Sequence, residues 1–119
     1  MEKDVLNYVM EKTRELMDAP TCSQETRAAA QQWLEAVGTD SQQEETRRYV
    51  QELEADIMPI DNLIGFAGSP QGEAYFGADT AAQVAGHARE IKAAGAKFCD
   101  CPACLAVAAI LEKKEAMLQ

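Results

Sequence analysis

The sequence is poor in aromatic residues, since Phe, Tyr and Trp together make up 6% of its 119 residues. Strands of a β-sheet favour aromatic and β-branched side chains, and no useful length of this chain alternates apolar and polar residues. The apolar share of 47% depends instead on alanine, which is the best helix former. We therefore expect closely packed helices and no sheet.

Positive charge is also scarce. The chain has 11 Lys and Arg against 20 Asp and Glu, a formal net charge of −9, and its basic residues form no stripe. An acidic surface repels phosphate backbones and anionic lipids, so we expect neither nucleic-acid binding nor binding to a membrane surface. There is no signal-peptide pattern at the N-terminus, and no apolar run approaches the roughly 18 residues of a membrane span. We expect a cytoplasmic protein.

Glycine and proline residues divide the rest of the chain into segments with apolar side chains at helical spacing. We expect a single domain over residues 1–119, an all-α helical bundle of about five main helical segments with two short helices in its middle. The main segments are predicted at residues of about 3–18, 23–37, 40–57, 79–94 and 102–118, and the short helices at about 60–67 and 70–76.

Capping residues set two of the predicted helix starts. Thr21 and Gln24 have the spacing of a capping box for the second helix. Ser69 followed by Pro70 fits an N-cap and the favoured first helical residue of the second short helix.

Three of the four cysteines fall within the stretch CDCPAC at residues 99–104. Pro102 suits the first turn of a helix, which makes Asp100 or Cys101 its N-cap. Backbone N–H groups and the helix dipole at such an end stabilise a thiolate, the form that binds metal or attacks a disulfide. In a reducing cytosol, clustered cysteines bind metal or exchange electrons more often than they form static disulfides.

A tetrahedral zinc site needs four ligands, and Cys99, Cys101 and Cys104 supply three of them. Cys22 is the preferred fourth ligand, because helices of alternating direction bring its loop to the end of the bundle where the cluster lies. His87 is held in reserve, since it is about 12 Å along its helix from that end. We predict zinc in a mainly structural site, because four thiolates leave no open position for a catalytic water.

Three alternatives stay open for the same thiols. An iron–sulfur cluster or copper(I) would also accept them. A CxxC at a helix start is also typical of thiol–disulfide redox proteins, in which Cys101 would attack and Cys104 resolve, although the βαβ pattern of such proteins is missing. The third alternative is a protein-binding module with inert thiols. The sequence contains no nucleotide-binding or hydrolase motif that would indicate an enzyme.

Two further features are expected to serve packing. His87 lies between Val84 and Ile91 on an apolar helix face, which favours a packed, hydrogen-bonded histidine over a metal ligand. The apolar side chains of the middle segment are expected in the core rather than on a partner-binding surface: Leu63, Ile64, Phe66, Tyr75 and Phe76.

A group of small bacterial helical proteins of unknown function resembles this chain in three stretches, LEADIMPIDNLIGFAGS, HAREIKAAGAKFCDCPAC and ILEKKEAML. The resemblance covers nearly the whole chain, including the C-terminal CxCxxC cluster. Some members carry an automatic label as heat-shock chaperones, but this chain has neither the glycine motifs of an ATP site nor the length of an ATP-dependent chaperone. The resemblance implies only that the four cysteines form the site to test.

Overall fold

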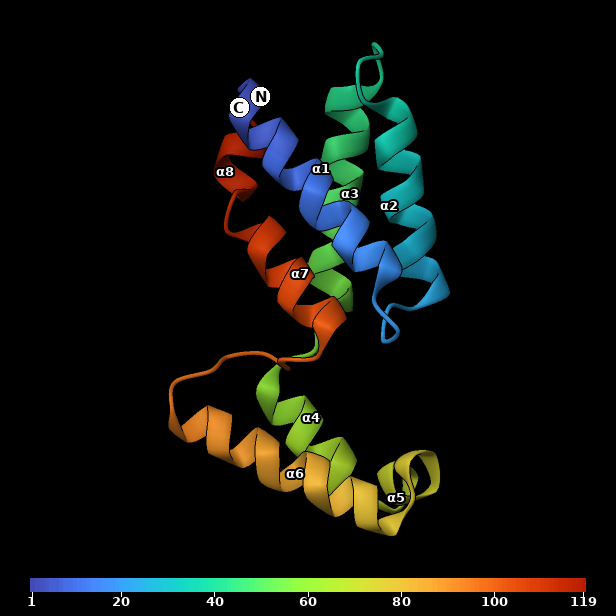
Figure 1. Cartoon of the computed structure of the whole chain (residues 1–119), viewed down its shortest axis with the longest axis vertical. Helices are drawn as coiled ribbons and strands as arrows, with labels where there is room; N and C mark the ends of the chain where they lie inside the picture. Colours follow the sequence, from blue (N-terminus) through green and yellow to red (C-terminus); the bar gives the residue numbers. More distant parts are fainter. The chain divides into compact units, whose positions relative to one another are not determined.

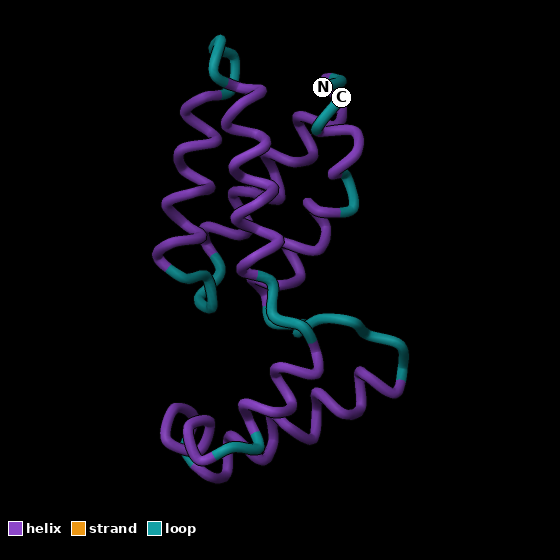
Figure 2. Tube along the Cα trace, turned by 180° about the vertical axis from the view of Figure 1, so that it is seen from behind, coloured by secondary structure: helices purple, strands orange, loops and turns teal.

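The computed structural model describes residues 1–119 and is all-helical, as Figure 2 shows. Its helices are α1 (Lys3–Asp18), α2 (Gln24–Ala36), α3 (Gln42–Asp56), α4 (Ile60–Ala67), α5 (Pro70–Phe76), α6 (Ala78–Ala93), α7 (Pro102–Leu111) and α8 (Lys114–Met117). The predicted all-α class is confirmed, whereas the grouping into about five main segments is not. No helix combines the length and the hydropathy that crossing a bilayer requires.

The helices group into two compact units, a division that the sequence did not predict. The terminal unit comprises residues 1–57 and 100–119, with α1, α2, α3, α7 and α8, and the middle unit comprises residues 58–99, with α4, α5 and α6 (Figure 1). That residues 1–119 form a single domain stays a prediction.

The terminal unit is a helical bundle in which α1 packs against α2 and α7, and α3 packs against α2 and α7. Its centre is a stack of Trp33 on Tyr49, with ring centroids 5.2 Å apart. Trp33 Nε1 donates to Thr46 Oγ1 at 2.9 Å, and the hydroxyls of Thr13 and Tyr49 share a hydrogen bond of 2.9 Å. Every polar group in this aromatic core is thus paired, which keeps its burial from costing free energy.

The middle unit packs α6 against α4 and α5 around a much smaller core of Ile60, Leu63 and Ala88. Helices α4 and α5 come close because Gly72 of α5 lies at their contact. A Cβ atom at Gly72 would lie 1.9 Å from the carbonyl oxygen of Phe66, so no other residue fits without a backbone shift. The core of this unit is small, and the close approach of α4 and α5 adds to the contribution of Ile60 and Leu63.

The aromatic side chains of the middle unit correct an expectation. Leu63 lies in the core and Ile64 packs against it, as predicted, whereas Tyr75 is 77% exposed and Phe66 is 37% exposed, so the predicted core positions are wrong for these two. They pack edge to face with each other and with Phe76 instead. Helices α4 and α5 are too short to enclose three aromatic rings.

The helix ends confirm one predicted cap and overturn another. The N–H of Gly72 donates to Ser69 Oγ at 3.1 Å, and Pro70 begins α5, as predicted. At the start of α2 the cap is Ser23, which accepts the N–H of Thr26 at 3.1 Å, so the capping role predicted for Thr21 is wrong. The last helix, predicted as one segment over 102–118, is divided into α7 and α8.

Candidate metal centre

Two of the clustered cysteines belong to the first turn of α7. Cys101 is the N-cap residue, with extended backbone angles of φ −62° and ψ 159°, and Pro102 follows as the first helical residue, as predicted. The N–H of Cys104 donates to Cys101 Sγ at 3.4 Å. The sulfur therefore occupies the place of the oxygen that usually caps a helix, and the helix start orients both thiols.

A second hydrogen bond ties this helix start to the loop between α1 and α2. The N–H of Ala103 donates to Thr21 Oγ1 at 3.1 Å, which satisfies another of the N–H groups that a helix start leaves unpaired. The loop that carries Cys22 therefore lies beside the start of α7. Sequence reasoning missed this role of Thr21, because no local pattern indicates a partner 82 residues away.

The third cysteine is anchored through its backbone. Cys99 N–H donates to the carbonyl oxygen of Met58 at 2.8 Å, next to the isolated antiparallel bridge between Pro59 and Phe98. The half-buried side chain of Cys99 packs against the core cluster of the middle unit. Its position is thus set by contacts other than those of Cys101.

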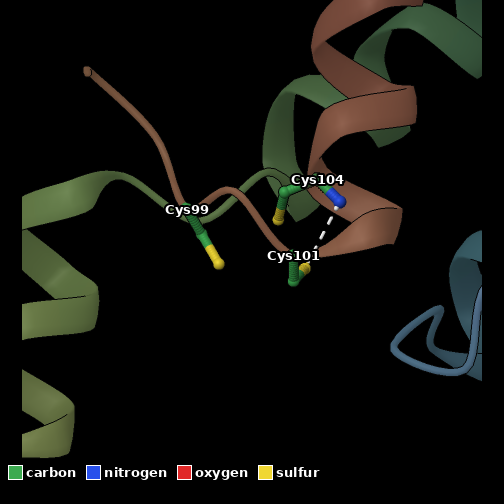
Figure 3. A group of neighbouring side chains, drawn as sticks. All are labelled: Cys99, Cys101 and Cys104. Atoms are coloured by element: carbon green, nitrogen blue, oxygen red, sulfur yellow. Dashed lines mark hydrogen bonds between the residues drawn. The ribbon is translucent and has the colours of Figure 1, made fainter. Parts of the chain in front are cut away.

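The sulfur atoms of Cys99, Cys101 and Cys104 all lie within 4.8 Å of one another, and Figure 3 shows the three side chains gathered on one continuous stretch of chain. Zinc–sulfur bonds of about 2.3 Å in a tetrahedron separate sulfur atoms by about 3.8 Å. Small side-chain rotations would close the remaining distance. Cys104 is buried, and the other two thiols are half-buried.

Cys22, the predicted fourth ligand, is not a member of this group of three. It is 8% exposed, and its thiol donates to the carbonyl oxygen of Ser23 at 3.4 Å. Burial raises the pKa of the Cys22 thiol above its ordinary value; Arg27 acts in the opposite direction, and Asp56 raises the pKa further. A metal would have to displace a firmly held proton from this sulfur.

His87 is also outside the group of three. Its side chain is exposed on α6, so the expectation of a packed histidine is wrong. The buried face of α6 is formed by its alanines, with half-buried Val84 and Ile91 packed against the core cluster of the middle unit.

Comparisons of the chain with protein-family models, with curated proteins and with solved structures find no match. The resemblance to small bacterial proteins therefore depends on the three quoted stretches alone. Of the site that it implies, the structure shows the gathering of Cys99, Cys101 and Cys104 near the C-terminus.

Three soft sulfur ligands at this spacing can hold a metal ion. The start of α7 adds backbone N–H groups and the positive end of the helix dipole, and both favour a negatively charged sulfur. The same geometry also brings two thiols close enough for thiol–disulfide chemistry. The arrangement is therefore a candidate metal centre with two thiols oriented by one helix turn.

Proposed function

We propose that the protein binds a thiophilic metal ion, zinc in the first place, through Cys99, Cys101 and Cys104. The observation that carries the proposal is the approach of their three sulfur atoms to within 4.8 Å on residues 99–104. Zinc ranks first because CxxC pairs in thiolate-rich tetrahedral sites are its ordinary ligands. Copper(I) and an iron–sulfur cluster are the alternatives for the same sulfurs.

The fourth ligand in this proposal is Cys22, with His87 in reserve. Support for Cys22 comes from the hydrogen bond between Thr21 and Ala103, which joins its loop to the start of α7. Ligation would require the Cys22 side chain to leave Ser23 and turn toward α7.

The proposed role of the metal is structural, in a cytoplasmic protein that is not an enzyme. A filled tetrahedral site offers no position for a catalytic water. The acidic surface, with 20 acidic against 11 basic residues, supports a function away from nucleic acids and anionic membranes. A protein partner is compatible with this role.

A series of single substitutions tests the ligand set. Zinc affinity would be measured by competition with a chromogenic chelator, under reducing conditions, for the wild type and for variants with Cys99, Cys101, Cys104 or Cys22 replaced by Ser. Loss of a ligand costs more than loss of a partner that only orients one, so we expect each of the first three variants to bind at least about 100-fold more weakly. His87→Ala tests the reserve ligand in the same assay.

The outcomes separate the parts of the proposal. A Cys22→Ser variant that binds as weakly as the other three identifies Cys22 as the fourth ligand, and a loss in His87→Ala instead refutes that assignment. Wild-type zinc affinity in Cys101→Ser would overturn the metal site itself.

A further inference from the structure

We propose that Cys101 and Cys104 form an oxidisable pair whose disulfide expels the metal, while Cys99 keeps its thiol. This regulation rests on the metal site proposed above. In a reducing solution Cys101 and Cys104 bind the metal, and in an oxidising solution they form a disulfide with each other.

The spacing of the pair fits a disulfide. By the radius, rotation and rise of an α-helix, residues three apart have Cα atoms about 5 Å apart. Disulfides need Cα atoms about 4.4–6.8 Å apart, so the bond can form without unwinding the helix. The Cys104 N–H that donates to Cys101 Sγ already holds that sulfur over the turn that carries Cys104.

Cys99 is a poorer partner for either thiol. The backbone of Cys99 is held by Met58, and its side chain packs on the core cluster of the middle unit. A bond to Cys99 would have to pull the residue away from both.

Burial sets the order of the reaction. Cys101 is half-buried and Cys104 is buried, so an external disulfide reaches Cys101 first. The Cys101 thiolate attacks a disulfide RSSR, forming Cys101–S–S–R and releasing RS⁻, which takes a proton from solvent to become RSH. The Cys104 thiolate then attacks the Cys101 sulfur, forming the Cys101–Cys104 disulfide and releasing a second RS⁻, which is protonated in the same way.

The metal loses two ligands in this exchange. Two thiolates are oxidised, one RSSR is reduced to two RSH with two protons from solvent, and the metal leaves as Zn²⁺, so atoms, charge and electrons balance. Of the proposed ligands only Cys99 and Cys22 are left, and two thiolates hold zinc much more weakly than four. Reduction of the disulfide by a dithiol restores the site.

The test treats the zinc-loaded full chain with oxidised glutathione. Zinc release would be followed with a chromogenic chelator, and the disulfide would be mapped by mass spectrometry of unreduced peptides. We expect the loss of one zinc ion and two thiols per chain, a Cys101–Cys104 linkage, and full reversal by dithiothreitol. Cys99→Ser and Cys22→Ser should form the same disulfide, and Cys104→Ser should stop at a glutathione adduct on Cys101.

Other results overturn the switch. A disulfide that includes Cys99 or Cys22 contradicts the switch, and so does zinc that stays bound to a chain with the Cys101–Cys104 disulfide. Neither result contradicts the proposal that the cysteines bind a metal. A reduced chain that binds no zinc overturns the proposed function itself, and this is measured before any oxidant is added.

Discussion

The two units differ in the size of the side chains that they bury. The nine largest fully buried side chains of the chain, with Trp33 and Tyr49 at their head, all belong to the terminal unit. In the middle unit the side chains exposed by 1% or less are those of Ala81 and Ala88, and its aromatic Phe66 and Tyr75 lie at the surface. A small core buries little apolar area, and burial contributes about 25 cal/mol per Å².

This difference indicates where stability resides. A core built from large side chains and paired hydroxyls should hold the terminal unit together, whereas the middle unit depends on the close contact of its helices at Gly72. We therefore expect amide hydrogens of α4 and α6 to exchange faster than those of α1 and α3. The following experiments break or sharpen that contrast.

The largest effect is expected from Trp33→Ala. Trp33 is fully buried, and its removal leaves a cavity and takes away the N–H that Thr46 Oγ1 accepts, so the free energy of unfolding should fall by about 3–5 kcal/mol. Leu63→Ala, in the smaller core, should cost about 2 kcal/mol because Leu63 borders the surface. Urea unfolding measures both, and hydrogen exchange shows which helices lose protection.

Equal loss of protection in α3 and α6 after Trp33→Ala would contradict a separate core for each unit. It would also confirm the single cooperative domain predicted for residues 1–119.

Alkaline pH should weaken the terminal unit selectively. Burial is the main cause that raises the pKa of Tyr49 from 10.0 to about 12; its hydrogen bond with Thr13 lowers the pKa, and Cys22 raises it. Above pH 10 the unfolded chain loses this proton first, so the free energy of unfolding should fall by about 2–3 kcal/mol between pH 10 and 12.

The substitution Tyr49→Phe isolates the contribution of Tyr49 to this pH dependence. The variant starts from lower stability, because Thr13 loses its partner, but it should lack the extra slope between pH 10 and 12. An unchanged slope, measured by urea unfolding at each pH, would show that another group carries the dependence.

Gly72→Ala tests the close contact in the middle unit. The added Cβ would meet the carbonyl of Phe66 at 1.9 Å, so we expect a loss of about 1–3 kcal/mol, with faster hydrogen exchange in α4 and α5. Gly65→Ala is the matched control, because nothing lies within 4 Å of its Cβ position; it should stabilise α4 by about 0.5–1 kcal/mol. Destabilisation of equal size by both would refute the role assigned to Gly72.

The smallest effect is expected at the start of α7. Thr21→Val removes the oxygen that accepts the Ala103 N–H and should cost about 1 kcal/mol, whereas Thr21→Ser should keep it. Thermal unfolding of the two variants measures the difference. The hydrogen bond contributes nothing if the Val and Ser variants melt together.

Local signals made much of the fold predictable. Pro59, Gly68, Ser69 and Pro70 limit the short helices, and α4 and α5 have the predicted bounds. The end of α7 at Leu111 carries no such signal. The residues that follow make tertiary contacts instead: Lys114 pairs with Glu54 at 3.0 Å, and Lys113 lies over the ring of Tyr8. Such contacts cannot be read from neighbouring residues.

The candidate site was predictable to the same degree. The gathering of Cys99, Cys101 and Cys104 follows from their spacing and from Pro102, and so does the capping role of Cys101. The anchoring of Cys99 by Met58 and of α7 by Thr21 depends on pairs far apart in the sequence. Periodicity also failed for the aromatic rings of the middle unit, because it indicates a face without saying whether anything large enough covers it.

The central claim is that the clustered cysteines are metal ligands. The most direct test is elemental analysis of the protein purified under reducing conditions without a chelator, with thiol reactivity counted in the same sample. The account predicts about one zinc ion per chain, with the thiols of Cys99, Cys101 and Cys104 unreactive toward a thiol reagent until the metal is removed. A chain without metal, in which all four thiols react at once, would contradict it.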